Sequence, residues 1–345
     1  MHRNPIAIVT FLLALALPGI AGAQDFFSPK PIGMGGAFRA VADDNGAIEY
    51  NPAGLAQQKG YDIEAVYFFG SPGETSLGHG SIVDGSTNPS VTAGLSVSYG
   101  DLPVTDLGDE EIQRTMRVRL ALSQQFGRSL SWGVAGKYIQ MSGGRARFPL
   151  SPDVVAGIPA PPQAVGRIPE QSFQSPAQSV DQIESILADV QNEARIVTLD
   201  LGLLFRPLRF LSLGFVGQNL IANELRQIRR KLVPAVAVFP IEMLTLAADF
   251  EIDLDDEPRR GTVAQHYGGA LLLGKSFEVR GGFTHDGTEE KNYWSLGVGA
   301  TFGNGFLNFG FQQDTADDAN RLFLVSLVIS LRPPQPINTF LRKPR

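Results

Sequence analysis

The chain has 345 residues, a formal net charge of −6 and no cysteine, and only 19% of its residues are charged although 43% are hydrophobic. The acidic balance gives no reason to expect nucleic acid as a partner, and the absence of cysteine excludes disulfides and thiolate metal sites. The charged fraction is low for a soluble protein, in which about a quarter of the residues usually carry charge.

Residues 1–23 have the pattern of a secretory signal peptide. His2 and Arg3 precede an apolar run at 6–17, and small residues follow up to Ala23. This run is shorter than the ~20 residues of a membrane-spanning helix, and no later apolar run is longer. We therefore expect Sec-type export with cleavage near Ala23, and a mature chain that is either secreted and soluble or a β-barrel of the bacterial outer membrane.

The next region, 24–60, fits neither a helix nor a strand. Gly33, Gly35 and Gly36 are too dense for a stable regular element, and the Asn-Pro-Ala-Gly sequence at 51–54 is typical of a turn. Small residues let one backbone approach another closely. We predict that this region is a plug, or hatch, packed inside the structure that the rest of the chain builds.

From residue 61 onward, apolar and polar residues alternate with the two-residue period of β-strands. Each segment has one apolar face and one face of polar or small residues. Met116 and Leu120, for example, share a side opposite Arg117 and Arg119. The fourteen predicted strands are 61–69, 74–82, 91–99, 113–126, 129–141, 194–205, 210–219, 231–239, 241–252, 265–274, 276–284, 291–302, 305–312 and 321–331.

Alternation alone fits a soluble sandwich as well as a barrel, but two further features favour the barrel. Trp294 and Phe302 lie near the two ends of one apolar face, roughly 26 Å apart along a strand, which approaches the height of a lipid-facing band between aromatic girdles. Beyond the third strand, tight turns also alternate with long connections. The long connections are 100–112, 142–193, 220–230, 253–264, 285–290 and 313–320.

Short turns on one rim and long loops on the other are typical of outer-membrane barrels. The sequence therefore predicts an all-β fold, a 14-stranded antiparallel transmembrane β-barrel over residues 61–331 with the hatch in its lumen. A periplasmic tail is expected at 332–345.

The longest predicted loop, 142–193, is rich in proline and apolar residues in its first part. A short amphipathic helix follows, with Ser179 and Gln182 as a capping box. Its apolar stripe either packs the loop onto the barrel mouth or also forms the wall of a groove for a hydrophobic ligand. The predicted groove residues are Phe148, Leu150, Val154, Val155, Ile183, Ile186, Leu187 and Val190.

The polar faces of the strands place charges of both signs in the lumen. These side chains either form an internal network with each other and with the plug, or present an arginine such as Arg117, Arg119 or Arg280 to an anionic head group. The predicted lumen charges are Arg117, Arg119, Asp200, Asp249, Glu278 and Arg280.

No motif points to catalysis or to a cofactor. The glycines at 33–36 lack the preceding strand and the spacing of a nucleotide-binding loop. His79, His266 and His285 lie neither at metal-ligand spacing nor beside a serine nucleophile. We therefore expect no enzyme activity, metal or cofactor. A basic cluster at 226–231 is expected to meet lipopolysaccharide phosphates or solvent, and the apolar strand faces to meet outer-membrane lipid.

Two segments resemble a known family. Residues 31–56, with Asn51-Pro52-Ala53, resemble the hatch of FadL-like outer-membrane proteins, and particularly the PorV/PorQ-type branch. Residues 214–220 are similar to a glycine-to-QNL segment of that branch. The resemblance implies a fourteen-stranded barrel that captures hydrophobic compounds among loops 142–193 and 220–230 and releases them past the hatch or sideways. The hatch residues that it implies are Gly33, Gly35, Gly36, Phe38, Asn51, Pro52 and Gly54.

Three functions remain open from the sequence. The first is an outer-membrane barrel for passive uptake of hydrophobic small molecules, of the long-chain fatty acid or aromatic type. The second is a PorV-like barrel that binds protein partners in secretion or envelope assembly. The third is a soluble secreted β-protein.

Overall fold

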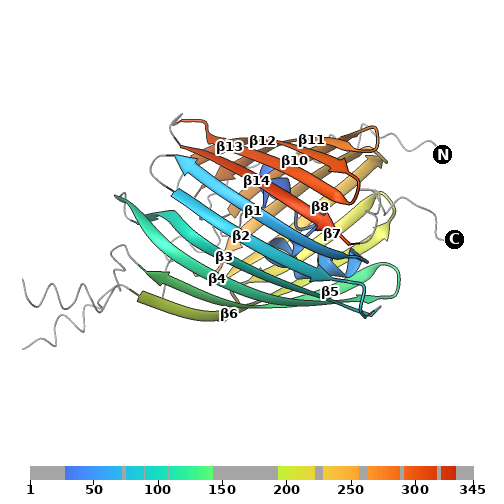
Figure 1. The fold of residues 1–345 in the computed structure, drawn as a ribbon, viewed down its shortest axis with the longest axis horizontal. Coiled ribbons are helices and arrows are strands. Elements are labelled where there is room, and N and C mark those ends of the chain that lie inside the picture. Colours follow the sequence, from blue (N-terminus) through green and yellow to red (C-terminus); the bar gives the residue numbers. More distant parts are fainter. Residues whose placement is uncertain are drawn as a thin grey trace, which may run out of the picture.

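The computed structural model describes residues 28–71, 75–88, 90–106, 109–142, 193–221, 228–255, 263–287, 291–316 and 320–331. The predicted signal peptide, the predicted groove residues in the loop 142–193 and the tail 332–345 lie outside these residues. Within them the chain forms a closed barrel in which fourteen antiparallel strands follow in chain order and β14 pairs with β1 (Figure 1). The predicted all-β class and strand number are confirmed.

The strands are β1 Tyr61–Ser71, β2 Thr75–Asp84, β3 Val91–Asp106, β4 Asp109–Phe126, β5 Leu130–Ser142, β6 Glu193–Leu208, β7 Leu211–Gln218, β8 Lys231–Ile241, β9 Leu244–Asp253, β10 Val263–Leu273, β11 Phe277–Asp286, β12 Lys291–Phe302, β13 Gly305–Asp314 and β14 Arg321–Ser330. Three short helices precede them: α2 Pro29–Gly33, α3 Ala47–Tyr50 and the 3₁₀ helix η1 Pro52–Gln57. None of the helices in the described residues is long and apolar enough to cross a membrane.

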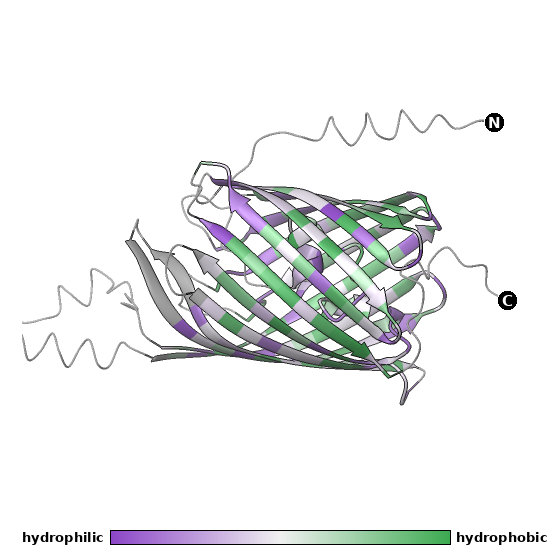
Figure 2. Ribbon diagram, turned by 45° about the horizontal axis from the view of Figure 1, so that its top comes forward, coloured by the Kyte–Doolittle hydropathy of each residue, from purple (hydrophilic) through white to green (hydrophobic). Residues whose placement is uncertain are grey.

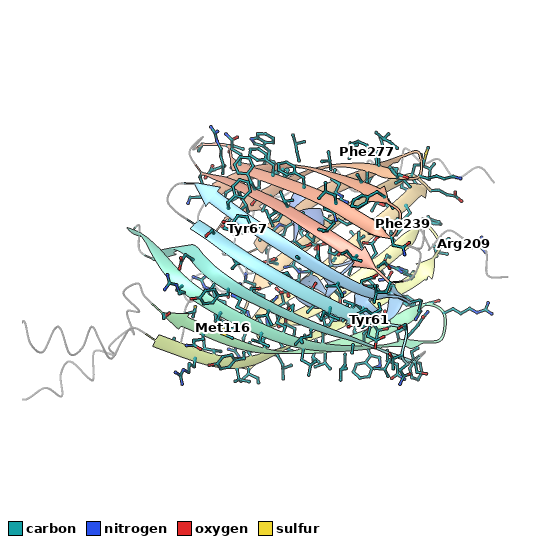
Figure 3. All side chains as sticks on the ribbon, viewed as in Figure 1. Tyr61, Tyr67, Met116, Arg209, Phe239 and Phe277 are labelled. Atoms are coloured by element: carbon teal, nitrogen blue, oxygen red, sulfur yellow. The ribbon has the colours of Figure 1, made fainter. Side chains whose placement is uncertain are left out.

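The alternation seen in the sequence becomes an inner and an outer face. On β4, Leu120 is 58% exposed while the neighbouring Arg119 and Ala121 are buried. Apolar and polar stripes accordingly alternate along the strands (Figure 2). The apolar side chains of the outer face include Tyr67 and Met116, which Figure 3 labels.

Aromatic side chains form a band at each end of the outer face. At one end Trp294, Phe311, Phe323 and Phe69 make a chain of ring contacts with centroids 4.9 to 5.2 Å apart. The exposed aromatic residues at the other end are Phe126, Trp132, Phe205, Phe210, Phe277 and Phe302.

Residues 28–58, here called the plug, lie inside the barrel (Figure 1). All of them are buried except Asp43, Asp44 and Gln57. Helix α2 packs on β11 to β14, and η1 packs on β3 to β6. The plug therefore bridges opposite sectors of the wall.

From β4 onward, tight turns alternate with longer connections and so define two rims of the barrel. The tight-turn rim carries turns at 127–129, 209–210, 242–243, 274–276 and 303–304, and the long-loop rim carries the connections 143–192, 219–230, 254–262, 287–290 and 315–320.

Two predicted connections were wrong. The loop expected at 100–112 is a continuation of β3 and β4, which stay paired up to Asp106 and Asp109, because strand pairing extends beyond the alternation of apolar residues. The turn expected at Pro240 lies at 242–243. Between Val238 and Ile241 the register with β9 shifts, and such an irregularity accommodates a proline within a strand.

Candidate functional site

Glycines on the inner face of the barrel receive the plug backbone. A Cβ atom at Gly268 or Gly282 would overlap the backbone of Met34 or Gly35, and Gly297 lies directly against Gly33. Gly35 itself has a positive φ of +61°, which favours glycine. The other inward glycines that a Cβ would bring into overlap with the plug are Gly94, Gly133, Gly202, Gly214 and Gly310. The wall thus has sockets for the plug on eight of its strands.

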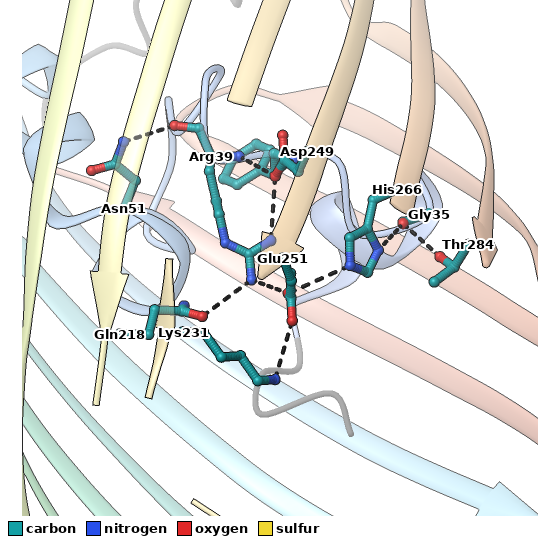
Figure 4. Close-up of polar contacts among 10 residues, drawn as sticks. Gly35, Arg39, Asn51, Gln218, Lys231, Asp249, Glu251, His266 and Thr284 are labelled. Atoms are coloured by element: carbon teal, nitrogen blue, oxygen red, sulfur yellow. Dashed lines mark hydrogen bonds and ion pairs between the residues drawn. The ribbon is translucent and has the colours of Figure 1, made fainter. Parts of the chain in front are cut away.

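Arg39 is the main charged contact from the plug to the wall (Figure 4). Its side chain is 2% exposed. Its Nη1 lies 3.3 Å from Asp249 Oδ2 and its Nη2 pairs with Glu251. The same Asp249 oxygen accepts the backbone N–H groups of Phe38 at 3.0 Å and Arg39 at 2.9 Å. One carboxylate on β9 therefore fixes both the backbone and the side chain of the plug.

Glu251 links two further side chains to this contact. Lys231 Nζ lies 3.1 Å from its Oε2, and His266 Nε2 lies 3.4 Å from its Oε1. The other ring nitrogen of His266 is 2.9 Å from the carbonyl oxygen of Gly35, which also accepts Thr284 Oγ1 at 2.6 Å. Side chains from β8, β9, β10 and β11 are thus joined to the plug at its Arg39 and Gly35. We call Arg39, Lys231, Asp249, Glu251 and His266 the latch.

The later part of the plug is held mainly by neutral hydrogen bonds. Asn51 Oδ1 accepts the N–H of Ala53, while its Nδ2 donates to the carbonyl oxygens of Arg39 and Leu203. Ser123 Oγ on β4 accepts the N–H of Ala56 at 3.2 Å. A buried ion pair between Glu49 and Arg119 adds one charged contact here.

Five of the six predicted lumen charges lie outside the latch. Arg119 meets Glu49 of the plug, and Arg280 Nε donates to Glu278 Oε1 at 2.5 Å. Arg117 is half-buried on the inner face of β4. Asp249 belongs to the latch. Among the described residues, no group of three or more His, Asp or Glu side chains could hold a metal ion.

Asp200 belongs to a second polar group at the end of β7. Lys137 Nζ lies 2.7 Å from Asp200 Oδ1 and donates to Asn219 Oδ1 at 2.5 Å. Asn219 has a positive φ of 55°, and its neighbour Gln218 accepts Arg39 Nη2 at 3.4 Å. The GQNL segment singled out in the sequence therefore ends β7 and reaches the plug.

The inner face is apolar near the long-loop rim in two sectors. Val66, Phe68, Leu77 and Leu324 surround Ile32 of the plug. On the other side Ile139 and Met141 of β5, Ile196 of β6 and Ile228 form a second buried cluster, with Ala194 against it. The apolar inner wall can accommodate hydrocarbon. The buried charges of the latch beside it can hold the plug in place.

The predicted hatch residues all lie in the plug, whereas the groove residues at 148–190 lie outside the described residues. Arg39 and His266 were not predicted as site residues. The prediction that Lys231 meets lipopolysaccharide phosphates or solvent was wrong, because Lys231 is 5% exposed and pairs with Glu251. One signal for Arg39 was available, because it is the lone arginine in a stretch of small residues and a buried arginine requires carboxylates. Asp249 and Glu251, two apart on a polar strand face, were the matching signal.

Three solved structures share this architecture. CymD, described as a monoaromatic hydrocarbon channel, matches with a TM-score of 0.61 and 13% identity over 90% of this chain and 99% of that one. The toluene transporter TodX of Pseudomonas putida matches at 0.55, with 12% identity over 91% and 99%. A Pseudomonas aeruginosa FadL homologue matches at 0.52, with 13% identity over 92% and 99%.

The chain has the fold of the FadL-like channels. The predicted resemblance to FadL-like proteins is thus confirmed as a shared fold of the chain, while the PorV/PorQ-type branch remains a prediction. No protein-family model matches the chain, and no curated protein matches it.

Proposed function

We propose that this protein is a passive, non-enzymatic channel of the outer membrane through which hydrophobic small molecules enter. The long-loop rim faces the outside and the tight-turn rim faces the periplasm. Ligands are captured at loops 142–193 and 220–230, meet the apolar inner wall, and pass when the plug releases. Signal cleavage near Ala23 and contact with lipopolysaccharide are parts of this proposal.

Outer-membrane placement is supported by the outer face of the barrel. Large apolar side chains such as Leu120 and Val197 are more than half exposed. Leaving so many large apolar side chains in water is unfavourable, and extensive exposed apolar surface marks an interaction surface. The aromatic bands at its two ends match the girdles of membrane barrels.

The observation that carries the proposed uptake is the apolar inner wall at the long-loop rim. A barrel that admits polar solutes has a polar, water-filled interior. Here Ile139, Met141 and Ile196 point inward. CymD and TodX, which share the fold, are channels for a monoaromatic hydrocarbon and for toluene, and this supports the same substrate class here.

Uptake of radiolabelled toluene and oleate by cells that carry the protein tests the proposal. Deleting residues 148–190 should abolish uptake, because the predicted capture groove is removed. Ile196→Thr should lower uptake several-fold by placing a hydroxyl on the apolar inner wall, while Val197→Thr, on the outer face of the same strand, is the matched control. Unchanged uptake after the deletion would contradict the proposal.

A further inference from the structure

The inner face of β5 and β6 changes from charged to apolar within one inward position. Lys137 and Thr198 are register partners, and the next inward pair toward the long-loop rim is Ile139 and Ile196. Met141 follows on the same face and is 4% exposed. Because Lys137 is paired with Asp200, the polar side of this boundary is already neutralised.

Ile228, from the connection between β7 and β8, completes this apolar surface. It is 5% exposed and belongs to the cluster of Ile139, Met141 and Ile196. Ile221, at the other end of the same connection, is 44% exposed. The protein thus places one side chain of its own against the part of the wall that fits a hydrocarbon ligand.

The same segment continues directly into the latch. Lys231, three residues after Ile228, begins β8 and lies 3.1 Å from Glu251 Oε2. The other oxygen of Glu251 pairs with Arg39. The register partner of Lys231 on β7 is Gln218, which also accepts from Arg39. A shift of Lys231 therefore acts on both side chains that hold Arg39 Nη2.

We propose that Ile228 is a tethered occupant of an apolar ligand subsite, and that a ligand which displaces it loosens the plug through Lys231 and Glu251. The subsite presents only hydrocarbon and thioether groups, so it takes an uncharged apolar molecule or the apolar end of a larger one. This inference rests on the proposed function. A ligand shifts the plug equilibrium only through a difference in affinity, and competition with Ile228 supplies that difference.

Linkage also sets a requirement that operates without any ligand. If ligand binding loosens the plug, loosening the plug must strengthen ligand binding by the same factor. Because the ligand acts by displacing Ile228, removal of the Ile228 side chain should also loosen the plug. Ile228→Ala removes most of the side chain and keeps the backbone that leads to Lys231.

Hydrogen exchange of the full-length protein in lipid nanodiscs tests this step. The amides of Phe38 and Arg39, which donate to Asp249, should exchange roughly tenfold faster in Ile228→Ala than in the unaltered protein, as expected when a buried side chain is truncated. Ile228→Leu and the control Ile221→Ala should exchange at the unaltered rate. Equal rates in Ile228→Ala and the unaltered protein would overturn the proposal. If Ile228→Ala fails to assemble, Ile228→Val gives the same comparison with a smaller effect.

The route through Lys231 is tested by a double variant. Lys231→Met should by itself speed exchange of the Arg39 amide. Ile228→Ala combined with Lys231→Met should exchange no faster than Lys231→Met alone, because both changes act on one path. Multiplying effects would show that Ile228 stabilises the plug independently, which overturns the relay.

Saturating toluene separates this inference from the proposed function. Toluene should speed exchange in the unaltered protein and have a smaller effect in Ile228→Ala. If cells take up toluene but exchange does not respond, the relay is wrong and the proposed function stands. If uptake itself is absent, the proposed function is wrong, and the ligand-free comparison still decides whether Ile228 holds the latch.

Discussion

The outer and inner faces of the barrel are built from the same fourteen strands but obey different rules. The outer face needs only large apolar side chains, and Leu, Val, Ile and Phe succeed one another along it. The inner face carries glycines where the plug approaches, alanines beside them and charges opposite plug charges. Alternate residues of a strand face opposite sides, so adjacent positions can differ completely in what they tolerate.

The outer face is thus specified by hydrophobicity alone, and the inner face by shape and pairing. Exchanging one apolar residue for another leaves a lipid-facing surface apolar. Adding a Cβ atom at an inner glycine that contacts the plug displaces the plug backbone. Substitutions at neighbouring residues on opposite faces should therefore differ strongly in effect.

The largest effect is expected for Gly282→Val on β11. A Cβ here would overlap the backbone of Gly35 and Met34, and no flexible side chain can move aside. The cost should exceed the ~1–3 kcal/mol of ordinary overpacking, so α2 should leave its place. Ion conductance in planar lipid bilayers should rise well above that of the unaltered barrel.

Gly281→Val is the matched control for this change. The nearest atom to a Cβ at Gly281 is the Ser295 carbonyl oxygen at 4.0 Å, so this valine adds only apolar surface to the outer face. Its conductance should equal that of the unaltered protein. Equal conductance of the two variants would show that the inner glycines are not sockets.

An intermediate effect is expected for Asp249→Ala. The change removes the acceptor of two plug amides and one partner of Arg39. Breaking a buried ion pair costs about 3–5 kcal/mol, and Glu251 retains part of the compensation, so the loss should fall below this range. The plug should stay docked most of the time, with exchange of the Phe38 amide more than tenfold faster. Phe250→Leu on the outer face should leave it unchanged, and a similar acceleration there would argue against a specific latch.

The same division explains how far the sequence could predict the structure. Alternation located all fourteen strands and assigned Arg119 and Leu120 to opposite faces, because period two is a local property. The end of the β3 and β4 hairpin was missed because pairing there continues past the apolar alternation. The existence of each strand could thus be predicted from the sequence, whereas its limits depended on pairing with the neighbouring strand.

The plug and latch were readable only in part. Dense glycine at 33–36 predicted close packing, but nothing local identifies Gly268 or Gly282 as their partners, since an isolated glycine in a strand looks only like a weak point. Asp249 was predicted to face the lumen, yet its bond to Phe38 spans 211 residues of sequence. Such pairs arise from tertiary packing and leave no spacing in the sequence.

The smallest effect is expected at the long-loop rim, where the distinction between faces fades because both meet water. Arg230 donates to Asp255 from its backbone N–H and from Nε, each at 2.7 Å. Burial alone would raise the pKa of the Asp255 carboxyl, but these hydrogen bonds outweigh it and lower the pKa below its ordinary value. The stabilisation is therefore present above the ordinary carboxyl pKa of about 4 and is lost as the pH falls through the lowered value.

Asp255→Asn tests the contact between Arg230 and Asp255 and the direction of its pH dependence. A partly exposed pair contributes no more than about 1 kcal/mol, so exchange of the Arg230 amide at pH 6 should be up to about fivefold faster in the variant. Well below the lowered pKa the carboxyl is protonated and resembles the amide, so the ratio of the two rates at one pH should fall toward one. Intrinsic exchange chemistry cancels in that ratio. A ratio that grows as the pH falls would mean that the charged carboxylate weakens the contact with Arg230. That result would contradict the stabilising pair described here.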